Sequence, residues 1–383
     1  MTPKERFIAA LERRTPDRLP VTTHHVMPYF LDNYMGGMGE QTFFDHFGLD
    51  PITWPVHFGP DTARGERHSE TVPEWVESDQ WWYEQETAEG RHGSATRTAI
   101  HTPKGTLTTV SEENPHTTWQ LEYPIKEKRD IEILAEFAPW PVCDVPAAQR
   151  DAAAFGGRGL VRGTFPMFPT GGQPGCWQDA ACLYGIEKLI MAAFEDPQWV
   201  HEFLAILRDR KLNYVASMHG APYDLLELGG GDASTTVISP QIFNDFVAPY
   251  DAPIIAAAHE AGQRVVYHTC GGMMPILEDL AAMGPDALET FTPVGMGGDV
   301  DLAEAKRRIG GKVGLIGGFD QFHFFKDCTP EETRAEVRRC FEAAGDGGGY
   351  ILSPSDHFFD ADPALIAAYA GEARKCWYNG AHV

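Results

Sequence analysis

A histidine and a cysteine lie two residues apart in the stretch RVVYHTCGG (264–272). The residues before them are apolar, as in a buried β-strand, and two glycines follow. Alternate residues of a strand face the same side, so His268 and Cys270 are expected to point together, while Tyr267 and Thr269 face the opposite way. Imidazole and thiolate on one small surface are half of the ligand set of a zinc site. The structural alternative is that Cys270 fills an apolar space and His268 is a hydrogen-bonded core residue.

Two further predicted strand ends carry polar side chains. Glu289 lies in the apolar run DALETF (286–291), where a carboxylate is costly unless it is paired or bound to a metal. Asp356 and His357 directly follow the run YILSP (350–354). We expect these groups to converge with the His-Cys pair on one rim. The alternatives are an ion pair with an arginine for Glu289 and a helix cap for Asp356.

The first predicted strand and the fourth supply other polar groups. His24 and His25 close the run LPVTTHH (19–25), so one of them faces inward, as a general acid or base, as a metal ligand, or simply as a hydrogen-bonding residue. Glu227 lies at the end of YDLLEL (223–228), and Asp232 follows soon after. Glu227 and Asp232 are candidates to orient a zinc-bound histidine or the substrate. Capping of the next helix is the alternative for Asp232.

Short apolar runs alternate with helical patterns along the chain, which is typical of a parallel sheet surrounded by helices. Eight strands are predicted, the number of a closed α/β barrel, so we expect a (β/α)8 TIM barrel as a single domain over 1–383. The segment of about 70–125 is rich in threonine, aromatic residues and turn pairs, which predicts an antiparallel β insertion. The eight predicted strands are 19–25, 50–56, 159–165, 223–228, 264–270, 286–291, 312–318 and 350–354.

The composition limits the kinds of binding partner that the protein can have. The 383 residues include 31 lysines and arginines and 55 acidic residues, which gives a net charge of −24. A charge of this size and sign repels nucleic acid and anionic lipid. Seven scattered cysteines do not form a disulfide framework, and no run is long and apolar enough for a membrane span or a signal sequence. We therefore expect a cytoplasmic protein with reduced thiols.

Aromatic and sulfur side chains gather after the third predicted strand. Met167, Phe168 and Trp177 are candidates for the wall of an apolar pocket, suited to an aromatic methyl ether or a corrinoid ring. The alternative is that they belong to the core, as most such residues do.

Four segments resemble the uroporphyrinogen decarboxylase superfamily, and more closely its zinc methyltransferase branch. These are MTPKERFIAALERRTPDRLPV (1–21), HTCGG (268–272), GGFD (317–320) and GGGYILSPS (347–355). That branch includes the methylcobamide:coenzyme M methyltransferases and the methyltransferase components of O-demethylases. The resemblance covers nearly the whole chain and implies a (β/α)8 barrel with a zinc ion. By similarity to the cobalamin-independent methionine synthases, His268, Cys270 and Glu289 match three zinc ligands in order and approximate spacing.

The fourth ligand position departs from the thiol-methylating relatives, which carry a cysteine after the final strand. This chain has SPSDHF, so Asp356 or His357 stands there, which disfavours a thiol acceptor such as coenzyme M. Oxygen and nitrogen ligands leave zinc a stronger Lewis acid. The resemblance then implies that zinc polarises a small O-methyl or N-methyl donor and that the methyl group passes to a corrinoid, free or carried by a partner protein. Transfer in the opposite direction, from a methyl-corrinoid to an acceptor, stays open.

Two other functions remain as alternatives. One is a metal-free decarboxylase or lyase that acts on a small carboxylated substrate, in which Asp356, His24 and His25 handle protons. A porphyrinogen is disfavoured as its substrate, because no arginine lies between Arg18 and Arg64 to bind so many carboxylates. The other is a corrinoid or tetrapyrrole binding protein without turnover. The resemblance leaves both a monomer and a homodimer open.

Overall fold

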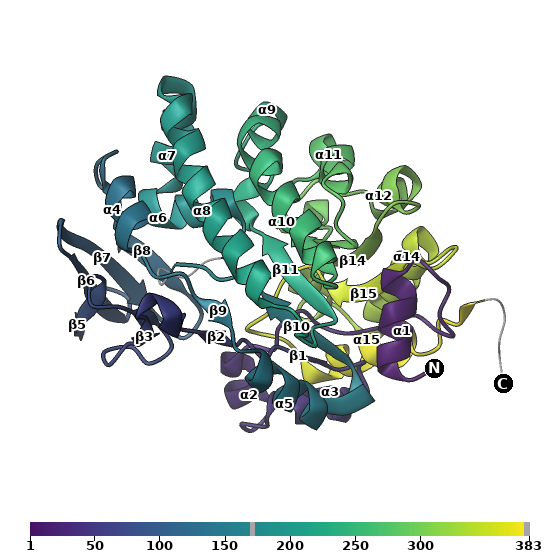
Figure 1. The fold of residues 1–383 in the computed structure, drawn as a ribbon. Coiled ribbons are helices and arrows are strands. Elements are labelled where there is room, and N and C mark those ends of the chain that lie inside the picture. The colour runs from purple at the N-terminus through teal and green to yellow at the C-terminus, as the bar shows by residue number, and fades with distance from the viewer. Residues whose placement is uncertain (169–172, 379–383) are drawn as a thin grey trace.

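The computed structural model describes residues 1–168 and 173–378 (Figure 1). Seven parallel strands form one curled sheet in the order β1-β10-β11-β12-β13-β14-β15. After β1, each strand pairs with the next one of this sheet along the chain, as expected when a helix crosses back between parallel strands. The predicted class, an α/β fold of the TIM-barrel type, is confirmed. The strands are Ile52–Thr53 (β1), Leu160–Thr164 (β10), Leu225–Gly229 (β11), Val265–His268 (β12), Ala287–Thr290 (β13), Gly314–Phe319 (β14) and Tyr350–Pro354 (β15).

The first predicted strand, 19–25, is not a regular strand, and this corrects the prediction. Only Val21 forms a bridge, parallel to Leu352 of β15, and its carbonyl accepts from the backbone N–H of Asp50 at 2.7 Å. The N–H of Val21 donates to the Asp50 carboxylate instead of to a strand carbonyl, and Pro20 has no N–H to donate. The extended segment around Val21 therefore lies between β15 and the residues that lead into β1, without a continuous ladder.

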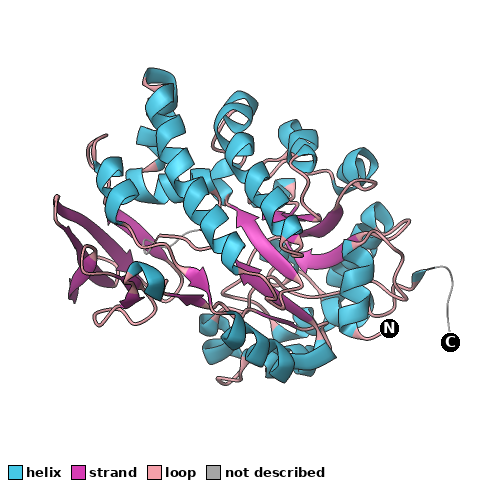
Figure 2. Ribbon diagram, in the orientation of Figure 1, coloured by secondary structure: helices cyan, strands magenta, loops and turns pink. Residues whose placement is uncertain are grey.

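Helices cover the outside of the sheet (Figure 2). The long helix α8 packs on α10, and α14 packs on α15. None of the helices in the described part of the chain combines the length and the apolar character that a bilayer span requires. The α-helices are Pro3–Leu11 (α1), Pro28–Tyr34 (α2), Glu40–Phe47 (α3), Asp130–Phe137 (α4), Val145–Phe155 (α5), Cys176–Tyr184 (α6), Ile186–Glu195 (α7), Pro197–Ser217 (α8), Pro240–Ile242 (α9), Ala248–Glu260 (α10), Leu277–Ala282 (α11), Leu302–Ile309 (α12), Gln321–Phe324 (α13), Pro330–Ala344 (α14) and Pro363–Ala373 (α15).

The predicted antiparallel insertion is present at one side of the molecule (Figure 1). Its four-stranded sheet has the order β5-β6-β7-β8. Trp81, Tyr83, Ile100 and Leu107 of this region belong to the same hydrophobic cluster as the barrel core, so the insertion is packed against the barrel. Two short antiparallel pairs, β2 with β9 and β3 with β4, connect it to the barrel. The strands are Phe58–Gly59 (β2), Arg67–His68 (β3), Val76–Glu77 (β4), Trp82–Glu89 (β5), Ser94–Thr102 (β6), Gly105–Glu113 (β7), Thr118–Glu122 (β8) and Val142–Cys143 (β9).

Candidate functional site

A buried arginine lies among the strand ends, and we did not predict it. Arg162 is the third residue of β10, and its side chain is 4% exposed. Its Nη1 and Nη2 donate to the two carboxylate oxygens of Glu289 at 3.0 and 2.8 Å, and Nη2 also donates to Glu227 at 3.3 Å. The guanidinium lies 4.1 Å from the ring centroid of Trp54. The alternative stated for Glu289, an ion pair with an arginine, is therefore present. The only sequence signal for Arg162 was one charge inside the apolar run 159–165.

His24, rather than His25, contacts these charged groups. Its Nδ1 lies 3.3 Å from Arg162 Nη1 and 3.5 Å from Glu289 Oε2, and its Nε2 lies 3.5 Å from Glu227 Oε2. Nδ1 of His24 therefore faces both the Arg162 guanidinium and the Glu289 carboxylate, and Nε2 faces Glu227. His24 thus links the two carboxylates on the side of the barrel interior.

His25 lies beside His24, with their ring centroids 4.3 Å apart, and its ring also packs on Trp54 at 4.7 Å. Burial, and next the charge of His24, lower the pKa of His25 to about 2. A histidine with so low a pKa is uncharged at neutral pH and is poorly matched to general acid or base catalysis there. In this arrangement His25 is suited to hydrogen bonding at the rim.

His268 and Cys270 point to the same side, as strand alternation predicted. His268 Nε2 lies 2.9 Å from Cys270 Sγ. On the opposite face, the Tyr267 hydroxyl donates to Asp251 of helix α10 at 2.9 Å. His268 is the last residue of β12 and is buried, whereas Cys270 lies two residues beyond it and is partly exposed. The pair therefore lies at the carboxyl end of the strand, where barrels of this type place their active sites.

The two ring nitrogens of His268 have different partners. Nδ1 lies 3.1 Å from Glu289 Oε1, and Nε2 faces Cys270. An ionised carboxylate only accepts hydrogen bonds, so Nδ1 carries a proton and Nε2 is the nitrogen available to a metal once any proton on it is displaced. A metal bound by Nε2 and Sγ would leave Glu289 in the role of the carboxylate that orients the ring. As the side chains stand, Glu289 is not directed at the same point as Nε2 and Sγ.

The charges around His268 explain its protonation. Burial lowers the pKa of His268, but the negative charges of Cys270 and Glu227 outweigh it and hold the pKa well above its usual value. Burial raises the pKa of Glu289, but the charges of Arg162 and His24 reverse this and hold it well below its usual value. Metal binding at Nε2 would accordingly release a proton from the imidazolium.

A wider group of possible ligands surrounds Arg162. Atoms of His24, Glu227, His268 and Glu289 all lie within 4.8 Å of one another. The guanidinium of Arg162 already contacts three of these four side chains, and arginine keeps its charge under all ordinary conditions. A divalent ion among all four would be placed against this fixed cation. The donor set that fits zinc best is therefore His268 Nε2 with Cys270 Sγ, on the side away from Arg162.

Backbone strain occurs directly after Glu289. Thr290 has φ of +89°, a conformation that is a true outlier for a β-branched residue. Its hydroxyl donates to the carbonyl of Thr269 at 2.6 Å, which ties the end of β13 to the residue between His268 and Cys270. Strain of this kind persists where the surrounding structure holds it and is frequent at functional sites.

Asp356 and His357 follow β15, as predicted, and bind each other. Asp356 Oδ1 lies 2.9 Å from His357 Nδ1 and accepts from the backbone N–H of His357 at 2.7 Å. Burial raises the pKa of Asp356, but the hydrogen bond from His357 and the charges of His357 and His268 outweigh this and hold the pKa below its usual value. Asp356 is thus within electrostatic range of His268. Both side chains are about one-third exposed, so they can reorient toward a ligand.

The four predicted substrate contacts have different positions. Met167 and Phe168 line a cavity on the insertion side of the barrel. Trp177 has no exposed surface and packs on Phe246. Asp232 accepts from Gln178 Nε2 at 2.9 Å, and its own N–H donates to Gln178 Oε1 at 2.8 Å. The structure thus groups His24, Glu227, His268 and Glu289 around Arg162, with Cys270 beside Nε2 of His268. None of the four predicted substrate contacts has a hydrogen bond or ion pair to this group among the described residues.

Comparisons with known proteins place this site in a family. The family model "Uroporphyrinogen decarboxylase (URO-D)" matches residues 164–374, which is more than half of the chain. The chain belongs to the uroporphyrinogen decarboxylase family. It is 27% identical over 248 residues to the uroporphyrinogen decarboxylase of Psychromonas ingrahamii, covering 61% of this chain and 64% of that protein. With the Aeromonas salmonicida enzyme it shares 26% identity over 271 residues, covering 67% and 70% of the two chains.

Among solved structures, a methyltransferase from Methanosarcina mazei has a similar fold. The TM-score is 0.65 at 15% sequence identity, and the match covers 98% of this chain and 99% of that one. The likeness extends over the insertion as well as the barrel.

Proposed function

We propose that this protein is a zinc-dependent methyltransferase that moves a methyl group between a small O-methyl or N-methyl compound and a corrinoid. The observation that carries the proposal is the contact of 2.9 Å between His268 Nε2 and Cys270 Sγ, with Nδ1 of the same ring held by Glu289. A nitrogen and a sulfur donor on one rim, with a carboxylate that orients the imidazole, is the arrangement that zinc sites in proteins use.

The other residues of the site would support this pair. Arg162 keeps Glu289 ionised and in place, so that Glu289 can hold the proton on Nδ1. Asp356 or His357 would complete the ligand set from the end of β15. When bound, the zinc ion would supply a Lewis acid for the heteroatom that carries the methyl group. A corrinoid, free or held by a partner protein, would approach the same carboxyl face. The fold shared with the Methanosarcina mazei methyltransferase agrees with this proposal.

Family membership favours one alternative, a lyase that acts on a small carboxylated substrate. The curated relatives are decarboxylases, and the site includes histidines and carboxylates that can handle protons. Arg162, however, is already paired with Glu227 and Glu289, so it offers no uncompensated charge to a substrate with many carboxylates. This favours methyl transfer over decarboxylation of a polyanion.

Metal analysis and an activity screen test the proposal together. Purified protein is analysed for zinc and is then incubated with cob(I)alamin and methoxylated aromatics, methylamines or methyl thioethers. We expect stoichiometric zinc, its loss in Cys270→Ala but not in the control Cys182→Ala, and demethylation of one compound class. Folded protein that holds no zinc after purification or zinc addition, and that releases CO2 from a carboxylated substrate, would overturn the proposal in favour of the lyase.

A further inference from the structure

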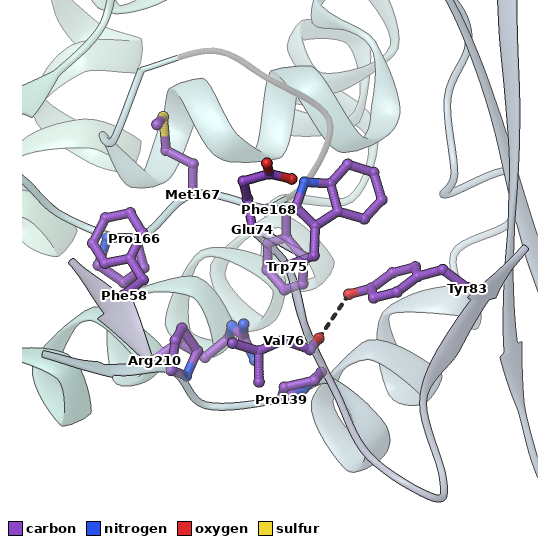
Figure 3. A pocket seen from close by; sticks show the side chains of 11 residues that line it. Phe58, Glu74, Trp75, Val76, Tyr83, Pro139, Pro166, Met167, Phe168 and Arg210 are labelled. Carbon is purple, nitrogen blue, oxygen red and sulfur yellow. Dashed lines mark hydrogen bonds between the residues drawn. The ribbon is translucent and has the colours of Figure 1, made fainter. Parts of the chain in front are cut away.

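A cavity of about 280 Å³ lies where the insertion meets the barrel (Figure 3). Its walls come from β2, β4, β5, the segment after β10 and helix α8. Most of the lining is apolar, because it consists of four aromatic rings, three prolines, a methionine and a valine. Its volume is at the small end of ligand pockets, roughly 300 Å³, and suits a ligand of about one ring.

One lining residue, Arg210 of α8, does not match these apolar walls. Its side chain is 9% exposed, and its guanidinium lies 4.3 Å from the ring centroid of Phe168. Nη1 is buried without a hydrogen-bond partner among the described residues. The charged residues on either side of it are paired elsewhere: Arg208 binds Asp209, and Lys211 binds Asp179.

No acidic side chain of the described residues forms an ion pair with Arg210. Glu74 lines the cavity too, but it is exposed, and Figure 3 shows its carboxylate away from the guanidinium. Glu66 accepts backbone N–H groups of Asp61 and Trp140. Tyr83 donates its hydroxyl proton to the carbonyl of Val76. The charge of Asp179 also acts on Arg210, but Oδ2 of Asp179 accepts from Lys211 and no hydrogen bond joins Asp179 to Arg210.

An unpaired buried charge is unfavourable in the free protein. Burial lowers the pKa of Arg210 to about 10, which still leaves it cationic at neutral pH. A group that destabilises the fold in this way is typical of a binding site, where the ligand supplies the missing partner.

We propose that this cavity binds a small aromatic carboxylate, with its carboxylate on Arg210 and its ring among Phe58, Trp75 and Phe168. The planar guanidinium and a planar carboxylate match each other in two parallel hydrogen bonds. A single cation among apolar walls favours a monoanion over a phosphate, which needs more donors. The inference does not depend on the proposed methyl transfer, because none of the lining residues belongs to the His268 site.

Calorimetric titration of the full chain with benzoate tests the proposal, with benzamide as a neutral ligand of the same shape. We expect benzoate to bind and Arg210→Met to weaken its Kd roughly 10- to 100-fold, because a hydrogen-bonded charge pair is lost. Arg208→Met, two residues earlier on α8, is the matched control and leaves the Kd unchanged. Benzamide binds weakly to all three proteins, and quenching of tryptophan fluorescence by benzoate is reduced in Trp75→Phe.

Thermal unfolding of the same variants excludes a folding defect. Because Arg210 lacks a partner, Arg210→Met should have an equal or higher Tm than the wild type while it loses benzoate. The proposal is overturned if benzoate does not bind at millimolar concentration, if it binds Arg210→Met as well as wild type, or if benzamide binds as tightly as benzoate.

Discussion

Arg162 and Glu289 form a two-fold hydrogen-bonded ion pair across the barrel interior, at 3.0 and 2.8 Å. The two side chains come from β10 and β13, which are not neighbours in the sheet. The same carboxylate lies 3.1 Å from Nδ1 of His268, whose Nε2 faces Cys270. The ion pair therefore determines how the imidazole is presented at the rim.

Glu289→Gln should weaken zinc binding without abolishing it. If Glu289 orients His268 from outside the ligand set, we expect a loss of roughly 10- to 100-fold in zinc affinity. Glu227→Gln is the control, since Glu227 contacts Arg162 and His24 but has no hydrogen bond to His268. Competition with a chromophoric chelator measures the zinc affinity of both variants. Complete loss of zinc in Glu289→Gln would instead identify Glu289 as a direct ligand.

Arg162→Met should destabilise the metal-free protein by about 3 to 5 kcal/mol at pH 7, because it leaves buried carboxylates without their cation. Urea unfolding measures the change. Arg162→Lys keeps the charge, so its free energy of unfolding should lie between those of the wild type and Arg162→Met. A double variant, Arg162→Met with Glu289→Gln, should recover part of the loss. No recovery would show that the destabilisation does not come from the unpaired carboxylate.

The contribution of Glu289 to stability should change with pH in opposite directions in the wild type and in Arg162→Met. In the wild type the pKa of Glu289 lies below its unfolded value, so its stabilising contribution is present above about pH 4 and is lost as the pH falls. Without Arg162, burial raises that pKa above the unfolded value, so Arg162→Met should regain stability relative to the wild type as the pH falls from 7 to 4. Unfolding free energies at these pH values measure the difference, and parallel profiles would contradict it.

Gly229→Ala should disturb the His268 strand. Gly229 has φ of +106°, and a Cβ there would lie 2.3 Å from the carbonyl oxygen of His268. Gly262→Ala is a matched control with φ of +78° and no atom within 4 Å of the added Cβ, so it carries backbone strain alone. We expect about 1 kcal/mol of destabilisation for Gly262→Ala and more for Gly229→Ala, with reduced zinc content only in the latter. Equal stability and zinc content in both variants would contradict the importance of this close approach.

Asp356→Asn and His357→Ala distinguish the two candidates for the last ligand position. The charge of His268 acts on the pKa of Asp356, so we expect Asp356→Asn to lower zinc affinity roughly ten-fold and His357→Ala to have little effect. Chelator competition on both variants measures this. A larger loss of zinc affinity in His357→Ala than in Asp356→Asn would assign the ligand position to His357.

The sequence by itself determined the local features of this protein. Alternation along residues 264–270 placed His268 and Cys270 on one side, and turn pairs with threonine-rich runs predicted the insertion. Seven of the eight predicted strands overlap observed strands. The prediction of a strand at 19–25 was wrong. The N–H of Val21, which a strand ladder would use, donates instead to the carboxylate of Asp50, 29 positions away in the sequence.

Only the tertiary structure decided which distant side chains meet. Periodicity tells which face a residue occupies, but the partner across a curved sheet depends on register and closure, which local patterns do not contain. The pairing of Arg162 with Glu289 could therefore be recognised only from the structure, in which β10 and β13 face each other across the barrel. Arg210 likewise became an unpaired cation only when the insertion covered helix α8, because burial and the lack of a partner are properties of packing and not of residue type.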